Sequence, residues 1–288
     1  MSCATTMAIN AICHYYKIVE FVPDNQNASE IWLRLAQSHY QQSEWSKVLT
    51  SLSKYQTSQG KMGSQQLSLK LGSQLQLKRW EQAIPTLEAL IEIEPNKLNW
   101  WRQMVSLQLK LSRNNQALDT LALAKLQKVE LTDSEKRLLA QLYAQRGIPE
   151  RAAIEISQLN GAYTDVALLV EQATYWQYAK EWSNAVDIWL IAAKQDSQYY
   201  WNAALLLSQQ GNYSKALAQL YKIDKNASPH SVTDIALAKV RAYYKLGQHN
   251  NALIEAKSIR EIAKTQSDRE QVEAWYQFLR QKHKKDLL

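Results

Sequence analysis

The stretch YWNAALLLSQQGNYSKALAQLYKI, residues 200–223, decides the fold. Its apolar residues recur at intervals of three and four on both sides of Gly211, which is the spacing of two successive amphipathic helices. We expect Gly211 to end the first helix, because glycine adopts the left-handed conformation past a helix C-terminus without steric cost. Two small residues, Ala204 and Ala216, stand twelve apart and would let the helix backbones approach closely. The stretch therefore predicts a pair of short antiparallel helices.

A motif of this kind recurs along most of the chain. The residues equivalent to Ala216 follow one another at intervals of 31 to 36 residues. We call these positions the anchors, and they are Val48, Ala83, Ala117, Ala152, Ala185, Ala216 and Ala252. An apolar residue stands twelve before each anchor. The residue three before is aromatic in four cases, Trp45, Trp80, Trp182 and Tyr213, and is Asn114, Pro149 or His249 in the others, where we expect less regular helix boundaries.

Small residues twelve apart, an aromatic residue, a glycine turn and a recurrence of about 34 residues resemble the tetratricopeptide repeat (TPR). The resemblance implies an all-α fold, a TPR-like right-handed superhelical solenoid of antiparallel helix pairs with roughly sixteen helices. In such proteins the first helix of each pair lines a concave surface, and the second helix packs behind it.

The repeats divide the chain into three expected segments. Residues 1–28 would hold an orphan second helix of a truncated repeat, because their apolar spacing matches a second helix and no first helix precedes it. Residues 29–266 would hold seven TPR-like repeats. Residues 267–288 would form a capping helix and a basic tail, and Ser267 with Glu270 matches a capping box. Such a helix would cover the apolar face of the last repeat.

Two local features interrupt the repeats. Pro85 lies two residues past an anchor and lacks a backbone N–H, so it should bend its helix. The stretch QTSQGKMGS, residues 56–64, contains two glycines and is expected to be a longer, flexible connection between repeats.

Composition supports packed helices and limits the function. The 288 residues include only 7 Gly and 5 Pro but 10 Trp and 15 Tyr, which suits helices better than strands or disorder. The net charge of +7 is spread evenly over both halves of the chain, whereas nucleic-acid binding usually needs a clustered basic face. No apolar run is long enough to span a bilayer. We therefore expect neither nucleic-acid binding nor membrane insertion.

The sequence offers no constellation for catalysis or metal binding. Its five histidines are scattered without paired spacing, and it has no glycine-rich phosphate loop. The two cysteines, Cys3 and Cys13, are too few and too close together for a disulfide framework or a metal site. Most tryptophans fall on repeat positions that predict packing in the core. We expect no enzymatic activity, no metal and no cofactor.

Function is expected on the concave surface. Amides there can hydrogen-bond an extended peptide, and arginines can pair with its carboxylates. The polar, modestly basic candidates for binding a protein or peptide partner are Gln37, Gln41, Arg102, Ser106, Lys110, Arg137, Gln141, Gln145, Thr174, Tyr178, Trp201, Arg241, Tyr244 and Lys245. The TPR subclass that binds chaperone C-termini has a Lys and an Asn where this chain has Leu33 and Gln37, so we do not expect that role.

Three segments carry a closer resemblance. They are LEALIEIEPNKLNWWRQMVSLQLKL (residues 87–111), LTDSEKRLLAQLYAQRGIPERAA (residues 131–153), and AYYKLGQHNNALIEAKSIR followed by VEAWYQFLRQ (within residues 242–281). Their order is similar to that in TPR proteins encoded with bacterial TonB–ExbB–ExbD energy-transducing systems. This resemblance implies a periplasmic, non-enzymatic accessory protein that supports TonB-dependent uptake, with TonB or Exb components as partners.

The N-terminus leaves an alternative open. The TonB-associated proteins carry an export signal and further repeats upstream, and neither precedes the repeats in this sequence. A periplasmic location is expected if an upstream export signal is missing from the chain. If Met1 is the true start, the expectation is a cytoplasmic TPR adaptor or assembly chaperone.

Overall fold

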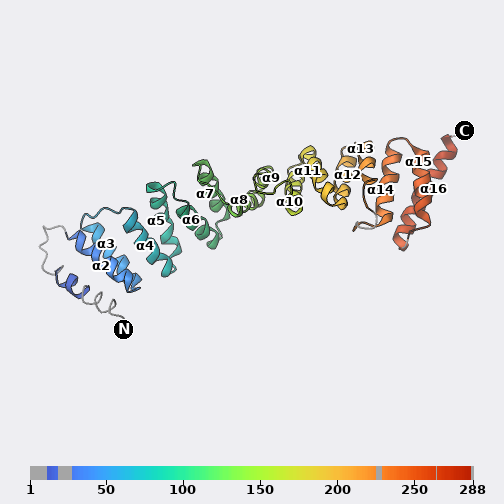
Figure 1. Cartoon of the computed structure of the whole chain (residues 1–288). Coiled ribbons are helices and arrows are strands. Elements are labelled where there is room, and N and C mark those ends of the chain that lie inside the picture. The colour runs from blue at the N-terminus through green and yellow to red at the C-terminus, as the bar shows by residue number, and fades with distance from the viewer. Residues whose placement is uncertain (1–11, 19–27, 225–228, 264, 287–288) are drawn as a thin grey trace. The chain divides into compact units, whose positions relative to one another are not determined.

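The computed structural model of the chain describes residues 12–18, 28–224, 229–263 and 265–286 (Figure 1). All regular secondary structure in these ranges is helical, which confirms the predicted all-α class. None of the helices within them combines the length and the apolar composition that crossing a membrane requires. Of the N-terminal segment expected to hold an orphan helix, the structure describes residues 12–18, which are helical, and residue 28; the rest lies outside the described residues.

The chain divides into two units, Met1–Glu135 and Lys136–Leu288. The helices of the first unit are α2 (Ser29–Gln41), α3 (Trp45–Thr57), α4 (Ser64–Gln76), α5 (Trp80–Ile93), α6 (Leu98–Lys110) and α7 (Asn114–Leu126), followed by the start of α8 (Asp133–Gln145). Here α2 packs on α3, α4 on α5, and α6 on α7, each pair joined by a short turn (Figure 1).

The second unit contains the rest of α8 and the helices that follow. They are α9 (Pro149–Ser157), α10 (Val166–Tyr178), α11 (Trp182–Gln195), the 3-10 helix η1 (Ser197–Tyr199), α12 (Tyr200–Gln209), α13 (Tyr213–Leu220), α14 (Val232–Lys245), α15 (His249–Arg260) and α16 (Gln266–Asp286). Here α10 packs on both α9 and α11, α12 on α13, and α14 on α15. The fold of each unit is thus a series of TPR-like helix pairs.

The anchors determine where each second helix sits. All seven anchors are completely buried. Each lies three residues after the first residue of its helix, including the helices that begin at Asn114, Pro149 and His249. Small anchors let the two helices of a pair pack closely, as Ala216 does against the almost fully buried Ala204. The boundaries are therefore as regular in these three pairs as in the others.

The turn inside each helix pair has one backbone conformation. Five residues before every anchor the backbone is left-handed, with φ between 56° and 83°, at Ser43, Lys78, Ser112, Gly147, Lys180, Gly211 and Gly247. The N–H of Gly211 donates to the carbonyl of Ser208 at 3.0 Å, and the N–H of Asn212 donates to that of Leu207 at 2.8 Å. This is a Schellman motif. It confirms Gly211 as the residue that ends its helix, and four equivalent turns adopt the same conformation without glycine.

The terminal helix α16 covers the last helix pair, as the predicted fold class requires. It packs on α15. Its residues Val272 and Leu279 are completely buried in a cluster that includes Val240 and Ala252, while Trp275 and Tyr276 pack against the edge of that cluster. The apolar face of the last pair is therefore not left open to water.

The cap of α16 differs from the predicted one. The helix begins at Gln266, and the hydroxyl of Thr265 accepts the backbone N–H of Asp268 at 3.1 Å. Ser267 therefore lies inside the first turn, and the predicted capping box with Glu270 is wrong. Both Thr265-x-x-Asp268 and Ser267-x-x-Glu270 match a capping pattern, so the local sequence does not choose between them.

The connection between α3 and α4, which the sequence predicted to be flexible, is hydrogen-bonded to the last turn of α3. It runs from residue 58 to residue 63, and within it the N–H of Gly60 donates to the carbonyl of Tyr55 at 2.9 Å. The hydroxyl of Tyr55 in turn donates to the carbonyl of Lys61 at 2.9 Å. A Cβ on Gly60 would come within 2.5 Å of the Tyr55 ring. The glycine is therefore needed for close packing of the loop on this ring.

Candidate functional site

A cavity of about 330 Å³ lies beside α6 in the first unit. Its walls come from three consecutive helices: α4 contributes Leu75, α5 contributes Trp80, and α6 contributes Arg102, Gln103, Ser106, Leu107 and Lys110. Three of the residues predicted for partner binding, Arg102, Ser106 and Lys110, are therefore brought together at one cavity. All three are exposed.

A larger cavity of about 470 Å³ lies beside α14 in the second unit. We call it the α14 cavity. It is lined by Leu205, Ser208 and Gln209 of α12, Tyr213 of α13, Ala238, Arg241, Ala242, Tyr244 and Lys245 of α14, and Trp275 of α16. Three more predicted residues, Arg241, Tyr244 and Lys245, thus meet at a second cavity.

The two cavities occupy the same place in the repeat. Counted from the anchors Ala117 and Ala252, both are lined by the residues 14, 11, 10 and 7 positions earlier, which include Ser106 and Lys110 in the first unit and Arg241 and Lys245 in the second. The aromatic residue that begins the preceding second helix forms a wall in both, as Trp80 and Tyr213. Each cavity therefore forms where one first helix packs beside the previous helix pair.

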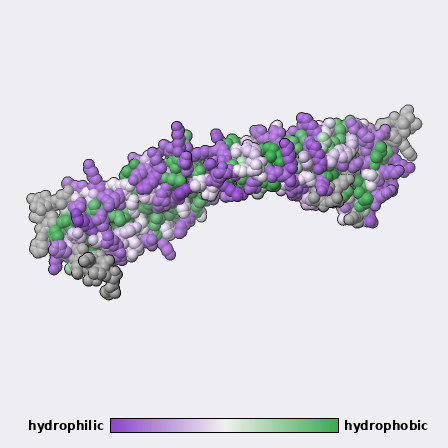
Figure 2. Space-filling model, in the orientation of Figure 1, coloured by the Kyte–Doolittle hydropathy of each residue, from purple (hydrophilic) through white to green (hydrophobic). Residues whose placement is uncertain are grey.

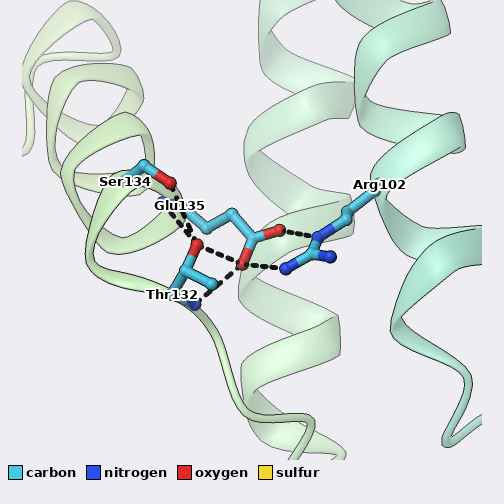
Figure 3. Close-up of polar contacts among 4 residues, drawn as sticks. All are labelled: Arg102, Thr132, Ser134 and Glu135. Carbon is cyan, nitrogen blue, oxygen red and sulfur yellow. Dashed lines mark hydrogen bonds and ion pairs between the residues drawn. The ribbon is translucent and has the colours of Figure 1, made fainter.

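The side chain of Arg102 is already hydrogen-bonded to an acidic residue of this chain (Figure 3). Its Nε and Nη2 both donate to the carboxylate of Glu135, at the start of α8. The same carboxylate accepts the backbone N–H and the hydroxyl of Thr132, each at 2.7 Å, and the Thr132 hydroxyl also lies 3.0 Å from that of Ser134. Thr132 and Glu135 form a capping box at the start of α8, and Arg102 is attached to it.

These contacts shift the acidity of Glu135. Burial raises the pKa of its carboxyl, but the hydrogen bonds from Arg102 and Thr132 outweigh burial, so the pKa lies below its ordinary value. Glu135 is therefore ionised at neutral pH and neutralises the guanidinium of Arg102. The arginine predicted to pair with a partner's carboxylate already pairs with one from this chain.

Arg137 is held in a similar way within the second unit. Its Nη2 donates to Glu171 of α10 at 2.8 Å. The hydroxyl of Tyr175 donates to the other oxygen of Glu171 at 3.2 Å. Burial, and then the negative charge of Glu171, raises the pKa of Tyr175 to about 12. Arg137 therefore joins two consecutive first helices.

The remaining predicted residues do not line either cavity. Thr174 donates its hydroxyl to the carbonyl of Val170 at 2.7 Å, as a helix-internal bond. Trp201 is half-buried and stacks on His230 with 4.6 Å between ring centroids. Gln37 is half-buried, and the exposed residues of this group are Gln41, Gln141, Gln145 and Tyr178.

The aromatic walls were not predicted as part of a site. Trp80, Tyr213 and Trp275 match repeat-core or cap positions in the sequence, so the pattern suggested packing alone. All three are half-buried and line a cavity, and Trp80 and Trp275 also pack against a core cluster. Of the ten tryptophans, only Trp100, Trp101 and Trp189 are fully buried. Five more tryptophans are partly buried and pack against a core cluster, so most tryptophans do contribute to the core: Trp32, Trp80, Trp176, Trp201 and Trp275.

The structure gives no sign of a metal centre in the part of the chain it describes, where no group of three or more His, Cys, Asp or Glu side chains could hold an ion. Hydrophilic residues predominate on the face shown in Figure 2, with apolar residues scattered among them in small patches. The fold and the two cavities define a TPR-like helical-repeat protein. Side chains of its first helices line cavities on the surface.

Comparison with known proteins supports the fold alone. No protein-family model and no curated protein matches the chain. Among solved structures, the chain is similar to one in the structure of Naa15/Naa10 bound to HypK-THB, with a TM-score of 0.57 and 15% identity over 85% of this chain and 38% of that chain. The chain thus spans well under half the length of that protein.

Two TPR proteins show a weaker similarity. One is a tetratricopeptide repeat protein from Parabacteroides merdae, with a TM-score of 0.39 and 12% identity over 87% of this chain and 98% of that chain. The other is YrrB, described as a TPR protein with an unusual peptide-binding site, with a TM-score of 0.39 and 14% identity over 68% of this chain and 92% of that chain. Scores this low carry no argument about function.

Proposed function

We propose that the chain is a non-enzymatic scaffold that binds a protein or peptide partner through the exposed face of its first helices. The supporting observation is the repeated cavity, which the same repeat positions line in each unit, with an aromatic wall and a lysine at the same place. Concave sites with mostly apolar walls and a few polar groups are where proteins bind ligand groups. A repeated site of this kind suits an extended partner that contacts several repeats.

The particular partner system that we propose is the bacterial TonB–ExbB–ExbD complex, with this chain as a periplasmic accessory component. Its support is the resemblance carried by residues 87–111, 131–153 and 242–281. Two of these segments supply cavity-lining residues, among them Lys110 and Lys245. The residues that carry the resemblance therefore overlap those that carry the proposed binding site.

A retention experiment tests both levels of the proposal. The chain is immobilised, and purified TonB and Exb proteins are passed over it at near-physiological salt. We expect at least one to be retained, and retention to fall by about tenfold for a chain with Lys110→Glu and Lys245→Glu, because rim charges contribute to encounter and pairing. A matched double variant, Lys54→Glu with Lys194→Glu, changes exposed lysines outside both cavities and controls for the same change in net charge.

The outcomes separate the alternatives. If neither TonB nor an Exb protein is retained, the TonB assignment fails. Fractionation of cells that express the native gene then decides the compartment: a periplasmic chain keeps the envelope proposal, whereas a cytoplasmic one favours the TPR adaptor or assembly chaperone. If the double variant retains its partner as well as the wild-type chain does, the cavities are not the binding surface.

A further inference from the structure

We propose that the α14 cavity holds an acidic segment of the partner, with one large apolar side chain in the cavity and carboxylates on either side of it paired with Arg241 and Lys245. This inference rests on the proposed scaffold function and names the chemistry of the segment that is bound. It also assigns that segment to the second unit rather than to the equivalent cavity of the first.

The walls of the α14 cavity are suited to an apolar side chain. Leu205, Ala238 and Ala242 provide aliphatic surface, and Tyr213 and Trp275 provide aromatic faces. Leu205 is 40% exposed, although its neighbours Ala204 and Leu206 in α12 are buried. A leucine or phenylalanine side chain placed in a space of about 470 Å³ would cover this apolar surface and displace water from it.

The aromatic wall is held in place before any partner binds. The ring of Tyr244 lies 5.7 Å from Trp275, 5.4 Å from Phe278 and 5.3 Å from His249, between ring centroids. Trp275 and Phe278 also contact each other edge to face at 5.9 Å. Because α14 and α16 fix one another through this cluster, binding would require little reordering of side chains.

The rim of the cavity carries positive charge that the described part of the chain does not neutralise. Arg241 and Lys245 lie one turn apart on α14, both are exposed, and neither makes an ion pair or hydrogen bond with the part of the chain that the structure describes. None of the cavity-lining residues is acidic. Helices α12 and α13 contain no Asp or Glu, and the single acidic residue of α14, Asp234, is bonded to Ser231 at the other end of that helix.

A third cation adds to the positive electrostatic potential near the α14 cavity. The ammonium of Lys282 on α16 lies 5.0 Å from the centre of the Tyr244 ring. Unpaired cations around a desolvated apolar site favour carboxylates, since ion pairs strengthen where water is excluded. The guanidinium of Arg241 can bind a carboxylate with two parallel hydrogen bonds. The cavity therefore fits an apolar residue flanked by Asp or Glu.

The equivalent cavity of the first unit lacks this property. Its arginine, Arg102, is bound to Glu135, and the ammonium of Lys110 lies 4.0 Å from the centre of the Trp80 ring. The position equivalent to Arg241 is Ser106. An acidic segment would thus find an unpaired arginine at the α14 cavity and none at the equivalent cavity of the first unit.

A peptide-binding experiment tests the assignment. The probe is a short fluorescein-labelled peptide, amidated at its C-terminus, with one central Phe flanked on each side by two Glu. Fluorescence anisotropy is measured with the full-length chain. We expect saturable binding that weakens by about tenfold when Glu is replaced by Gln or Phe by Ala in the probe, and that weakens as salt is raised.

Variants of the chain locate the site. Arg241→Glu combined with Lys245→Glu should reduce the affinity for the probe by at least about tenfold. Leu205→Trp should reduce it similarly by filling the cavity, and it changes an exposed residue, so the fold is retained and can be verified by circular dichroism. The control Lys54→Glu combined with Lys194→Glu makes the same change in net charge at exposed positions outside both cavities, and it should leave the affinity within about twofold of the wild type.

Each other outcome overturns the inference. Absence of saturable binding, equal binding of the Gln-substituted probe, or a loss of binding in the Lys54→Glu and Lys194→Glu control but not in the α14 variants would each do so. A free C-terminal carboxylate that binds without the flanking glutamates would show that the cavity recognises chain ends instead. Retention of TonB or Exb proteins by both the wild type and the α14 variants would refute this inference alone and leave the scaffold function standing.

Discussion

Glu135 shows how a single residue can join neighbouring helix pairs in this fold. It caps the start of α8 through Thr132 and binds Arg102 of α6 (Figure 3). Because its pKa is lowered in the folded chain, its contribution to stability is fully present above the ordinary pKa of Glu, about 4.3. That contribution is lost as the pH falls through the lowered pKa.

Glu135→Gln should therefore destabilise the first unit in a pH-dependent way. We expect a loss of about 1 kcal/mol at pH 7, the usual cost of weakening a helix cap. The difference from the wild type should shrink as the pH falls below the ordinary pKa of Glu, about 4.3, and on through the lowered pKa of Glu135, where its carboxyl becomes protonated in the folded chain. Urea denaturation at several pH values measures this.

The exposed Glu130 provides the matched control, since it precedes α8 in the same connection and Glu130→Gln removes the same charge. It should change the denaturation midpoint little at any pH. A Glu135→Gln difference that stays constant down to pH 3 would show that the ionised carboxylate is not what stabilises the junction.

The left-handed turn residues offer a second test at this scale. Lys180 has a φ of 60°, and its turn has the same hydrogen bonds as the Gly211 turn, with N–H groups of Lys180 and Glu181 donating at 3.0 Å. In this conformation a non-glycine residue is less stable than glycine by roughly 1–2 kcal/mol. Part of this advantage of glycine is offset, because glycine has more conformational freedom in the unfolded chain and loses more entropy on folding.

We expect Lys180→Gly to stabilise the second unit by about 0.5–1 kcal/mol and Gly211→Ala to destabilise it by about 1 kcal/mol. A Cβ on Gly211 would meet nothing within 4 Å, so its cost would be conformational and not steric. Thermal unfolding followed by circular dichroism measures both shifts. The two variants should shift the melting temperature in opposite directions. A Lys180→Gly variant with a lower melting temperature than the wild type would contradict this expectation.

At the scale of the element, α5 tolerates a proline in its interior. Pro85 is exposed, and the helix continues beyond it to Ile93. The proline has no N–H to donate to the carbonyl of Glu81 one turn earlier. No packing of Pro85 compensates, because its side chain faces solvent.

Pro85→Ala should therefore stabilise the first unit, by about 1–3 kcal/mol, by restoring a helix hydrogen bond and removing a clash with the preceding turn. The denaturation midpoint in urea measures the effect. The exposed Glu88 lies in the same helix, and Glu88→Ala provides a control that should change the midpoint only slightly. No gain for Pro85→Ala would mean that the helix has already adapted its backbone to the proline.

The helix pairs could be predicted from the sequence, because the residues that pack the two helices together recur at a regular spacing. An anchor and the apolar residue twelve before it fix a helix pair even where Asn114, Pro149 or His249 replaces the aromatic residue. Caps and turns were less predictable. Thr265 and Ser267 both suit an N-cap, and Lys180 gives no sign of a left-handed backbone, since tertiary packing imposes both choices.

The candidate site was predictable from the sequence only in part. Six of the fourteen residues that the register placed on the binding surface line one of the two cavities, among them Ser106 and Arg241, and the other eight do not. The register did not reveal that Arg102 and Arg137 are neutralised, because their glutamates lie 33 and 34 residues away on the next first helix. An acidic residue about one repeat beyond an arginine was the signal that would have identified these pairs.

At the scale of the whole molecule, the described helices α2 to α7 and α9 to α16 pack mainly on their neighbours in sequence. In such a chain, stability is close to a sum of local terms, and damage should remain near the repeat that carries it. Ala216 provides the test: it is completely buried in α13, and α13 packs on α12 and α14. Ala216→Leu adds bulk where two backbones approach closely.

We expect Ala216→Leu to cost about 1–3 kcal/mol by overpacking. Hydrogen exchange followed by mass spectrometry should show faster exchange in α12, α13 and α14, with α2 to α5 unchanged, because opening of a repeat array is local. Ser214→Leu, at an exposed position of the same helix, adds similar bulk without the clash and should leave exchange unaltered. Exchange that accelerates equally in α2 to α5 would show that the two units unfold together, and unchanged exchange everywhere would show that the anchor is not packed as described.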